Sequence, residues 1–173
     1  MGSCVLGWQL RAGQKGGASV GKTKRGKGTK VMLVADGEGL PLGLMLASAN
    51  QHEVRLAAAT LQTVRVPRRT GRSKQRPKEL VADKAYDSKH LRHWLRSLKI
   101  KTTIPPYQRR ERKRPKRGRP LRVGPGHGER WKVERTFAWL GSFRRLLVRH
   151  ERYPSIFRAF YLVAFIIISL RRF

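Results

Sequence analysis

The chain has 173 residues, and 40 lysines and arginines against 10 acidic residues give it a formal net charge of +30. This length supports one compact domain with its own core, and a hydrophobic content of 39% excludes a wholly disordered tail. Such a charge repels itself in the folded state unless a polyanion neutralises it. Nucleic acid is therefore the first expected partner, and an anionic membrane surface is the second.

The cysteine count and the N-terminal residues bear on the compartment. Cys4 is the single cysteine, which excludes an internal disulfide framework and a cysteine-based zinc site. The opening residues MGSCVLGWQL lack the basic and apolar regions of a signal peptide. We therefore expect a protein of a reducing cytoplasm.

The first third of the chain predicts a basic lead-in followed by a hairpin. Residues 1–28 are rich in glycine and lysine, so we expect a flexible segment there and a domain over 29–173. Strands are predicted over 30–35 and 40–47, joined by the Asp-Gly-Glu-Gly turn at 36–39. Both runs are almost continuously apolar, which is typical of a sheet covered on both faces.

The middle of the chain alternates between helix and strand patterns. A helix is predicted over 52–62, a basic loop over 66–78 and a strand over 79–82. A second helix is expected to start after Ser88 as its N-cap, and a strand follows over 100–104. Residues 107–120 form a charge run that predicts a loop.

Two further helices are predicted at the C-terminus. The first covers 130–147 and is expected to be the longest, and the second covers about 155–170. The apolar run at 159–170 is shorter than the roughly 20 residues that span a bilayer, so we expect a buried helix, with an interfacial helix as the alternative. The order of elements predicts an α/β fold with a mixed sheet.

The ten acidic residues can be considered individually. Asp36 and Glu38 lie in the predicted turn, and Glu53 and Asp87 lie near predicted helix starts. Glu111 and Glu151 are surrounded by arginines, which indicates solvated ion pairs.

Asp83 and Glu134 differ from the other carboxylates. Asp83 closes a short apolar strand, and ligands of α/β sheets bind at the carboxyl ends of strands. Glu134 follows the apolar Val133 in mid-helix, so we expect it to turn toward the core. Two such carboxylates would suit Mg²⁺ and phosphoryl-transfer chemistry. Helix-cap and salt-bridge roles are the alternative interpretations.

Three stretches of the chain carry a resemblance to a known family. They are "GKTKRGKGTKVMLVADGEGLPLGLMLASANQHE", "ADKAYDS" and "RWKVERTFAWLGSFRRLLVRHERYPSIFRAFYLVAFIIISLRRF". With them the chain resembles the C-terminal catalytic portion of bacterial insertion-sequence transposases of the DDE class. The resemblance implies a ribonuclease H-like mixed β-sheet flanked by helices, and an enzyme that cleaves DNA and joins the freed 3′ end to a target.

The resemblance also implies roles for particular residues. Asp83 matches the second catalytic carboxylate and Glu134 the third, and both would bind Mg²⁺ or Mn²⁺. Arg130 matches a basic residue one helical turn before the glutamate, from where it would reach a phosphate or the glutamate. His127 and Gly141 depart from the pattern, since tyrosine and lysine are often found there. The nearby Arg144 and Arg145 would supply the phosphate contact instead.

The first carboxylate of the family pattern has no counterpart. No acidic residue precedes Asp36, and Gly7 stands roughly where the aspartate is expected. No stretch of these 173 residues resembles the N-terminal DNA-binding region of such enzymes. The resemblance therefore predicts an N-terminally truncated or frameshifted transposase portion with an incomplete metal site and little activity alone. A non-catalytic nucleic-acid-binding protein and a basic membrane-associated protein are the alternatives.

The expected partner is DNA, both the insertion-sequence ends and the target, and a homo-oligomer is expected to form on it. No membrane partner is expected under this interpretation. Because no base-reading motif is visible, binding should be electrostatic and salt-dependent. Trp131 and Trp139 are expected in the core, with stacking on unpaired bases as the alternative. The residues expected to contact the DNA backbone are Lys24, Arg25, Lys27, Arg109, Arg110, Arg112, Lys113, Arg130, Arg144 and Arg145.

Overall fold

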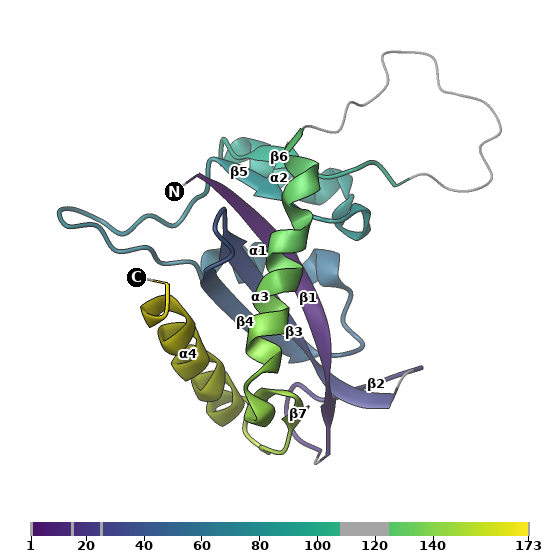
Figure 1. The fold of residues 1–173 in the computed structure, drawn as a ribbon. Coiled ribbons are helices and arrows are strands. Elements are labelled where there is room, and N and C mark those ends of the chain that lie inside the picture. Colours follow the sequence, from purple (N-terminus) through teal and green to yellow (C-terminus); the bar gives the residue numbers. More distant parts are fainter. Residues whose placement is uncertain (1, 15, 25, 108–124, 173) are drawn as a thin grey trace.

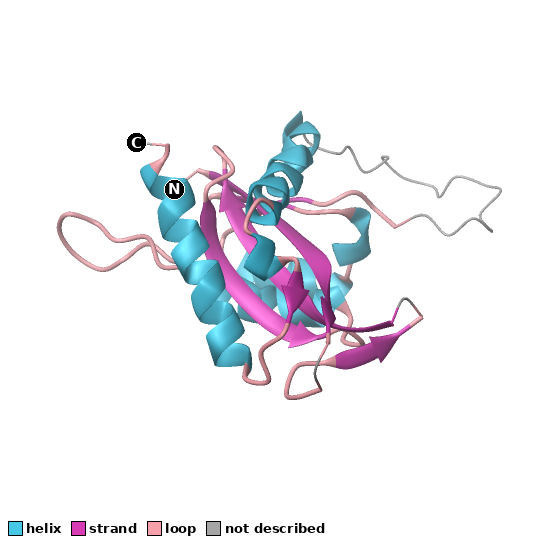
Figure 2. Ribbon diagram, turned by 60° about the horizontal axis from the view of Figure 1, so that its bottom comes forward, coloured by secondary structure: helices cyan, strands magenta, loops and turns pink. Residues whose placement is uncertain are grey.

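The computed structural model describes residues 2–14, 16–24, 26–107 and 125–172, and these residues form a seven-stranded sheet with helices on both faces (Figures 1 and 2). The strands are β1 (Ser3–Gly13), β2 (Gly21–Thr23), β3 (Gly26–Asp36), β4 (Pro41–Ser48), β5 (Glu79–Val81), β6 (Lys101–Thr103) and β7 (Val148–Arg149). The α-helices are α1 (Glu53–Gln62), α2 (Lys89–Ser97), α3 (Trp131–Gly141) and α4 (Pro154–Leu170). Short 3₁₀ helices are η1 (Lys84–Tyr86), η2 (Pro125–Arg130) and η3 (Arg144–Leu146).

Strand β1 lies at the centre of the sheet. It pairs antiparallel with β3 from Cys4 opposite Asp36 to Ala12 opposite Gly28. On its other edge it pairs parallel with β5, and β5 pairs parallel with β6. Strand β4 continues the sheet beyond β3, while β2 and β7 pair with the ends of β3 and β1. The sheet is thus mixed, as the sequence predicted.

Both faces of the sheet are covered, which confirms the prediction from the apolar runs. Along β3, Met32 and Val34 belong to a core shared with α1 and α2, whereas Val31 and Leu33 belong to a second core shared with α3 and α4. This alternation follows from the two-residue period of a strand. The hairpin turn is also confirmed, because the Asp36 carboxylate accepts bonds from two backbone amides of the turn.

The prediction of a flexible lead-in over 1–28 is wrong. Residues Ser3–Gly13 form the central strand, and Cys4, Val5 and Leu6 are fully or almost fully buried. The local sequence does not indicate this strand, because it is rich in glycine. Pairing with β3 and β5 stabilises the strand, and neither partner is a sequence neighbour of β1. Strand formation depends strongly on such tertiary context.

The prediction of one long helix over 130–147 is also wrong. Helix α3 ends at Gly141, where the Ser142 hydroxyl donates to the Trp139 carbonyl. The chain then turns through η3 into β7, where Val148 pairs with Ala12 of β1. Gly141 has a low helix propensity, and the pairing of β7 with β1 then fixes the new direction of the chain. In the described part of the chain, the longest helix is α4, with 17 residues.

Helix α4 is only half-buried, in contrast to the buried helix expected. Phe157, Tyr161 and Phe165 pack against the sheet face that α3 also covers. The opposite face is exposed and apolar, with Ile156, Leu162, Val163, Ile166 and Leu170. Within the described residues, no helix combines the length and apolar character needed to cross a membrane.

Arg149 is a fully buried cation that joins β7 to the rest of the fold. It donates to the hydroxyl of Thr29 at 2.7 Å and to the carbonyls of Glu151 and Arg152 at 2.9 Å. We expect Arg149→Met to lower the free energy of unfolding by about 3 kcal/mol or more, because charged hydrogen bonds contribute about 1.5–3 kcal/mol each. Urea unfolding measures this loss. The exposed Arg158→Met control is expected to change stability by about 0.5 kcal/mol or less.

Candidate active site

Asp83, Glu134 and Gly7 meet at one pocket of about 160 Å³. Strand register explains part of this arrangement, because Val5 of β1 pairs with Val81 of β5, and Gly7 and Asp83 each follow two residues later. Helix α3 crosses over β1 and brings Glu134 to the same place. The residues that line the pocket are Leu6, Gly7, Trp8, Asp83, Tyr86, Arg130, Val133, Glu134 and Phe137.

Arg130 bridges the two carboxylates. Its Nη1 lies 3.3 Å from Oε1 of Glu134 and 3.8 Å from Oδ2 of Asp83. Asp83 also caps η1, where Oδ1 accepts from the Lys84 amide at 2.7 Å. The expectation that Glu134 turns toward the core is wrong, since its side chain is 59% exposed and that of Asp83 is 44% exposed. The pocket thus holds two accessible carboxylates with one cation between them.

Gly7 brings bare backbone against α3. A Cβ atom at this position would lie 2.8 Å from Cγ1 and 3.0 Å from Cγ2 of Val133. Real side chains do not tolerate such a contact without a shift, and the branched Val133 has little rotamer freedom to give way. The position that the sequence marks as lacking an acid therefore faces this pocket, and α3 packs directly upon it.

Tyr86 is a buried pocket residue that the sequence reasoning did not single out. Its side chain is 1% exposed, and its hydroxyl has no hydrogen-bond partner among the described residues. Burial, followed by the charges of Glu53 and Asp83, raises the pKa of Tyr86 well above its usual value. The phenol is therefore a neutral potential donor beside the pocket. Its position three residues after Asp83, in the same short motif, is the signal that could have identified it.

The pocket fits a divalent cation only in part. Asp83 and Glu134 offer the oxygen ligands that Mg²⁺ prefers, and Mg²⁺ commonly takes one or two carboxylates and completes its shell with water and phosphate oxygens. However, no group of three or more histidine, cysteine, aspartate or glutamate side chains among the described residues is placed to hold a metal. Arg130 also lies between the two available ligands. The carboxylate oxygens of Asp83 and Glu134 suit Mg²⁺, but two carboxylates are fewer than the three of the family pattern.

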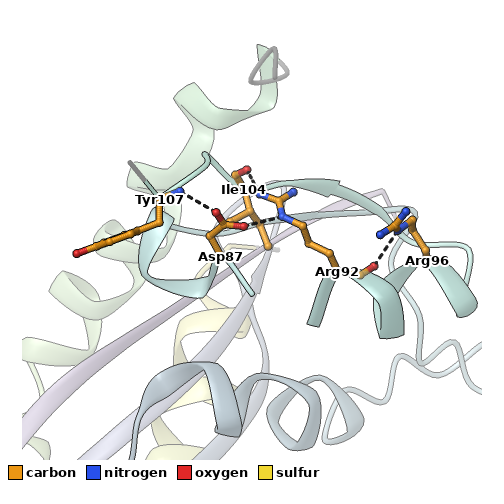
Figure 3. Close-up of polar contacts among 5 residues, drawn as sticks. All are labelled: Asp87, Arg92, Arg96, Ile104 and Tyr107. Atoms are coloured by element: carbon orange, nitrogen blue, oxygen red, sulfur yellow. Dashed lines mark hydrogen bonds and ion pairs between the residues drawn. The ribbon is translucent and has the colours of Figure 1, made fainter. Parts of the chain in front are cut away.

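Asp87 makes different contacts from Asp83. Its Oδ1 accepts from Nε of Arg92, and its Oδ2 accepts from the amide of Tyr107, both at 2.7 Å (Figure 3). Arg92 in turn donates to the carbonyl of Ile104 at 2.7 Å. The sequence placed Asp87 at the start of α2 with Ser88 as the cap. Ser88 does occupy the N-cap position but makes no side-chain capping bond. Asp87 instead fixes the chain between β6 and Tyr107.

The bonds to Asp87 make stability depend on pH. Burial alone would raise the pKa of this carboxyl, but the Tyr107 amide and Arg92 outweigh it and lower the pKa. The stabilisation is therefore fully present above the unfolded carboxyl pKa of about 3.9 and is lost as pH falls through the lower folded pKa. We expect Asp87→Asn to lower the free energy of unfolding by about 1–2 kcal/mol at pH 7.

Urea unfolding between pH 7 and pH 2.5 checks this expectation for Asp87. The difference between wild type and Asp87→Asn should shrink below about pH 4. Glu38→Gln, at an exposed position of the β3–β4 turn, is the matched control and should track wild type at every pH. A constant difference for Asp87→Asn across the whole range would contradict the assignment.

The predicted DNA-contacting residues that the structure describes separate into three groups, of which the third, Lys24 and Lys27, lies on the β2–β3 hairpin. Arg130 lies in the pocket, whereas Arg144 and Arg145 lie in η3 beyond the other end of α3, a helix of about 16 Å by its rise per residue. Arg145 pairs with Glu151 at 2.6 Å, and Glu151 is buried, so the prediction of a solvated Glu151 is wrong. Residues Arg25, Arg109, Arg110, Arg112 and Lys113 lie outside the described residues.

Lys24 and Lys27 are exposed on the β2–β3 hairpin. Lys24 lines an open hollow of about 730 Å³ together with Trp8, and Trp8 also lines the pocket that holds Asp83 and Glu134. The two hollows therefore share a wall. A polyanion that lay along them would pass from the hairpin lysine to the carboxylate pocket.

The two tryptophans of α3 lie at its surface. The guanidinium of Arg135 is 4.5 Å from the ring centre of Trp131 and 4.9 Å from that of Trp139. Trp131 is 49% exposed, so the expectation of a core position is wrong for it, whereas Trp139 packs partly against the core. Arg135 lies four residues from each tryptophan, so all three side chains lie on one helix face with Arg135 between the two rings.

Three comparisons relate this chain to known proteins. Residues 8–169 match the family described as transposase DDE domain. The chain is 36% identical over 135 residues to a putative transposase for insertion sequence element IS402 from Burkholderia cepacia. These aligned residues cover 77% of this chain and 58% of that protein. A piggyBac transposase chain, from the cryo-EM structure of its synaptic complex with hairpin DNA, aligns with a TM-score of 0.53 and 12% identity over 95% of this chain and 45% of that one. That likeness shows the fold, which is ribonuclease H-like.

Proposed function

This chain belongs to the transposase DDE domain family, and on that premise we propose that it is the catalytic portion of a DNA transposase. Its reaction would be cleavage of a DNA strand at the end of an insertion sequence and transfer of the freed 3′ end to a target. One observation supports this most strongly: Asp83, Glu134 and position 7 face the same pocket although they come from three distant parts of the sequence. The chain spans 58% of the length of its relative, so the proposal concerns this portion.

The residues of the pocket have separate roles under this proposal. Asp83 and Glu134 would hold Mg²⁺ or Mn²⁺, which when bound activates a nucleophile and stabilises the leaving oxygen. Arg130 would turn from the carboxylates to a phosphate oxygen of the DNA, where a guanidinium binds well. Tyr86 would donate from its buried hydroxyl into the pocket. Lys24 and Lys27 would bind the backbone of the same DNA.

The pocket would be weakly active as it stands. Gly7 supplies no ligand, and among the described residues the carboxylates that line the pocket beside Arg130 are Asp83 and Glu134. We therefore propose little strand cleavage by the chain alone. A non-catalytic DNA-binding protein is the second candidate, and the absence of a carboxylate at Gly7 together with the net charge of +30 favours it.

Metal-dependent nicking separates these two candidates. The substrate is a supercoiled plasmid that carries the DNA flanking the gene, incubated with Mn²⁺ or Mg²⁺ and the Gly7→Asp chain. We expect nicking above that of the unchanged chain, and Asp83→Asn or Glu134→Gln in the same background should remove it. If nicking is absent both from the Gly7→Asp chain and from Gly7→Asp/Val133→Ala, in which the new side chain has room, or if it persists in both carboxylate variants, the enzyme proposal fails and the DNA-binding proposal remains.

A further inference from the structure

The loop between α1 and β5 carries a concentration of positive charge that the pocket does not use. Seven of the 14 residues at positions 65–78 are arginine or lysine, and none is acidic. All seven except Lys74, which is half-buried, are exposed. We call residues 65–78, which are the loop predicted over 66–78 together with Arg65, the basic loop. Its cations are Arg65, Arg68, Arg69, Arg72, Lys74, Arg76 and Lys78.

The basic loop has a defined shape. Its base is fixed by the buried residues Val64 and Pro77. Val66 and Lys74 exchange two backbone hydrogen bonds of 2.9 and 2.8 Å, which close the loop as an antiparallel bridge. Gly71 has a φ of 84°, a conformation that suits glycine, at the tip where the chain reverses. Six of the seven cations, all except Arg69, line one open hollow of about 960 Å³.

The charge of the basic loop has no carboxylate counterpart in the described part of the chain. The ion pairs found there join other residues, such as Lys30 with Glu53 and Arg92 with Asp87. Seven like charges within 14 residues repel one another, and this repulsion falls when phosphates enter the hollow. Arginine is well suited to such a ligand because its planar donors bind phosphate oxygens in pairs.

The basic loop and the carboxylate pocket lie at opposite ends of β5. Lys78 directly precedes β5, and its amide donates to the Gly2 carbonyl at 3.1 Å. Asp83 follows the other end of the strand, five residues later, which is about 17 Å at the rise of an extended chain. From Lys78 the loop extends further away from the domain (Figure 1). A phosphate in the hollow is therefore well separated from one at Asp83.

We propose that the basic loop is a second DNA-binding site, which holds the phosphate backbone of a DNA segment other than the one at the Asp83–Glu134 pocket. The inference rests on the proposed function, because strand transfer joins two DNA segments and a phosphate-binding surface away from the pocket would hold the second of them. Recognition at the loop would be through phosphates and independent of base sequence.

The test compares two triple variants with equal net charge. The loop variant is Arg68→Gln/Arg72→Gln/Arg76→Gln. The control removes three exposed cations from α1, α2 and α4 as Arg55→Gln/Arg96→Gln/Arg158→Gln. Circular dichroism confirms that both variants fold. Two short duplexes with different fluorophores report bridging by energy transfer, and one labelled duplex reports single-segment affinity at several NaCl concentrations.

We expect the loop variant to need about tenfold more protein for bridging than the control does, while both bind a single duplex with similar affinity through the remaining surface. Equal bridging by the two variants would overturn the inference. A parallel loss of single-duplex binding and bridging in the loop variant would also overturn it, because the loop would then belong to the same DNA track as the pocket. Failure of the nicking test can be distinguished from failure of this inference, because DNA bridging requires no metal and no strand cleavage.

Discussion

In a chain that carries Gly7→Asp, the additional substitution Val133→Ala is expected to raise metal-dependent DNA nicking by about tenfold over Gly7→Asp alone. A Cβ at position 7 lies 2.8 Å from Cγ1 of Val133, so the new aspartate must displace α3 or adopt a strained rotamer. Overpacking of this kind costs about 1–3 kcal/mol, and a misplaced ligand raises the barrier by a comparable amount. Removing the two methyl groups allows the carboxylate to enter the pocket. Lowering the activation barrier by about 1.4 kcal/mol corresponds to the tenfold increase in rate.

The matched control for this pair is Gly7→Asn/Val133→Ala, which has nearly the same shape and no carboxylate. It should fold as well as the aspartate pair and nick no better than the unchanged chain. Val133→Ala alone is expected to lower the free energy of unfolding by about 1–3 kcal/mol, since Val133 is buried against the sheet. Urea unfolding therefore accompanies each activity measurement. If the asparagine pair nicks as fast as the aspartate pair, position 7 does not contribute a metal ligand.

Local patterns in the sequence predicted the elements that carry their own signals. The hairpin around Asp36, the helix after His52 and the strand before Asp83 have turn residues, caps or continuous apolar runs, and the structure confirms each. Strand β1 could not be recognised in this way. Its residues beyond Leu6 are mixed in polarity, and only pairing with β3 and β5 makes them a strand. Long-range pairing is invisible to a short sequence window.

The carboxylate pocket was predicted in part. The family motifs and the strand end identified Asp83, and the helix motif identified Glu134, because both signals are short and local. The exposure of Glu134, the buried state of Glu151 and the orphan hydroxyl of Tyr86 depend on how α3 and η3 pack on the sheet. The contact between Gly7 and Val133 is of the same kind, because it joins residues 126 positions apart. Such contacts follow only from the assembled fold.

Arg130→Gln is expected to tighten Mn²⁺ binding at the pocket by about tenfold. The guanidinium lies 3.3 Å from Glu134 and 3.8 Å from Asp83, so an incoming dication must displace it or share the carboxylates with it. The repulsion between a unit charge and a dication about 4–5 Å apart is about 2 kcal/mol in a medium like water, where these half-exposed groups lie. Relief of part of that repulsion gives the tenfold change. Electron paramagnetic resonance of free Mn²⁺ measures the affinity without DNA or turnover.

Three variants make the Arg130 result specific. Arg130→Lys keeps the positive charge and is expected to bind Mn²⁺ as weakly as wild type does. Arg144→Gln removes the same charge beyond the far end of α3 and is expected to have no effect on Mn²⁺ affinity. Glu134→Gln added to Arg130→Gln should abolish the gain, because one of the two carboxylate ligands is then lost. If Arg130→Gln and Arg144→Gln tighten Mn²⁺ binding equally, the effect comes from the overall field of the protein, and Arg130 does not compete with metal for the carboxylates.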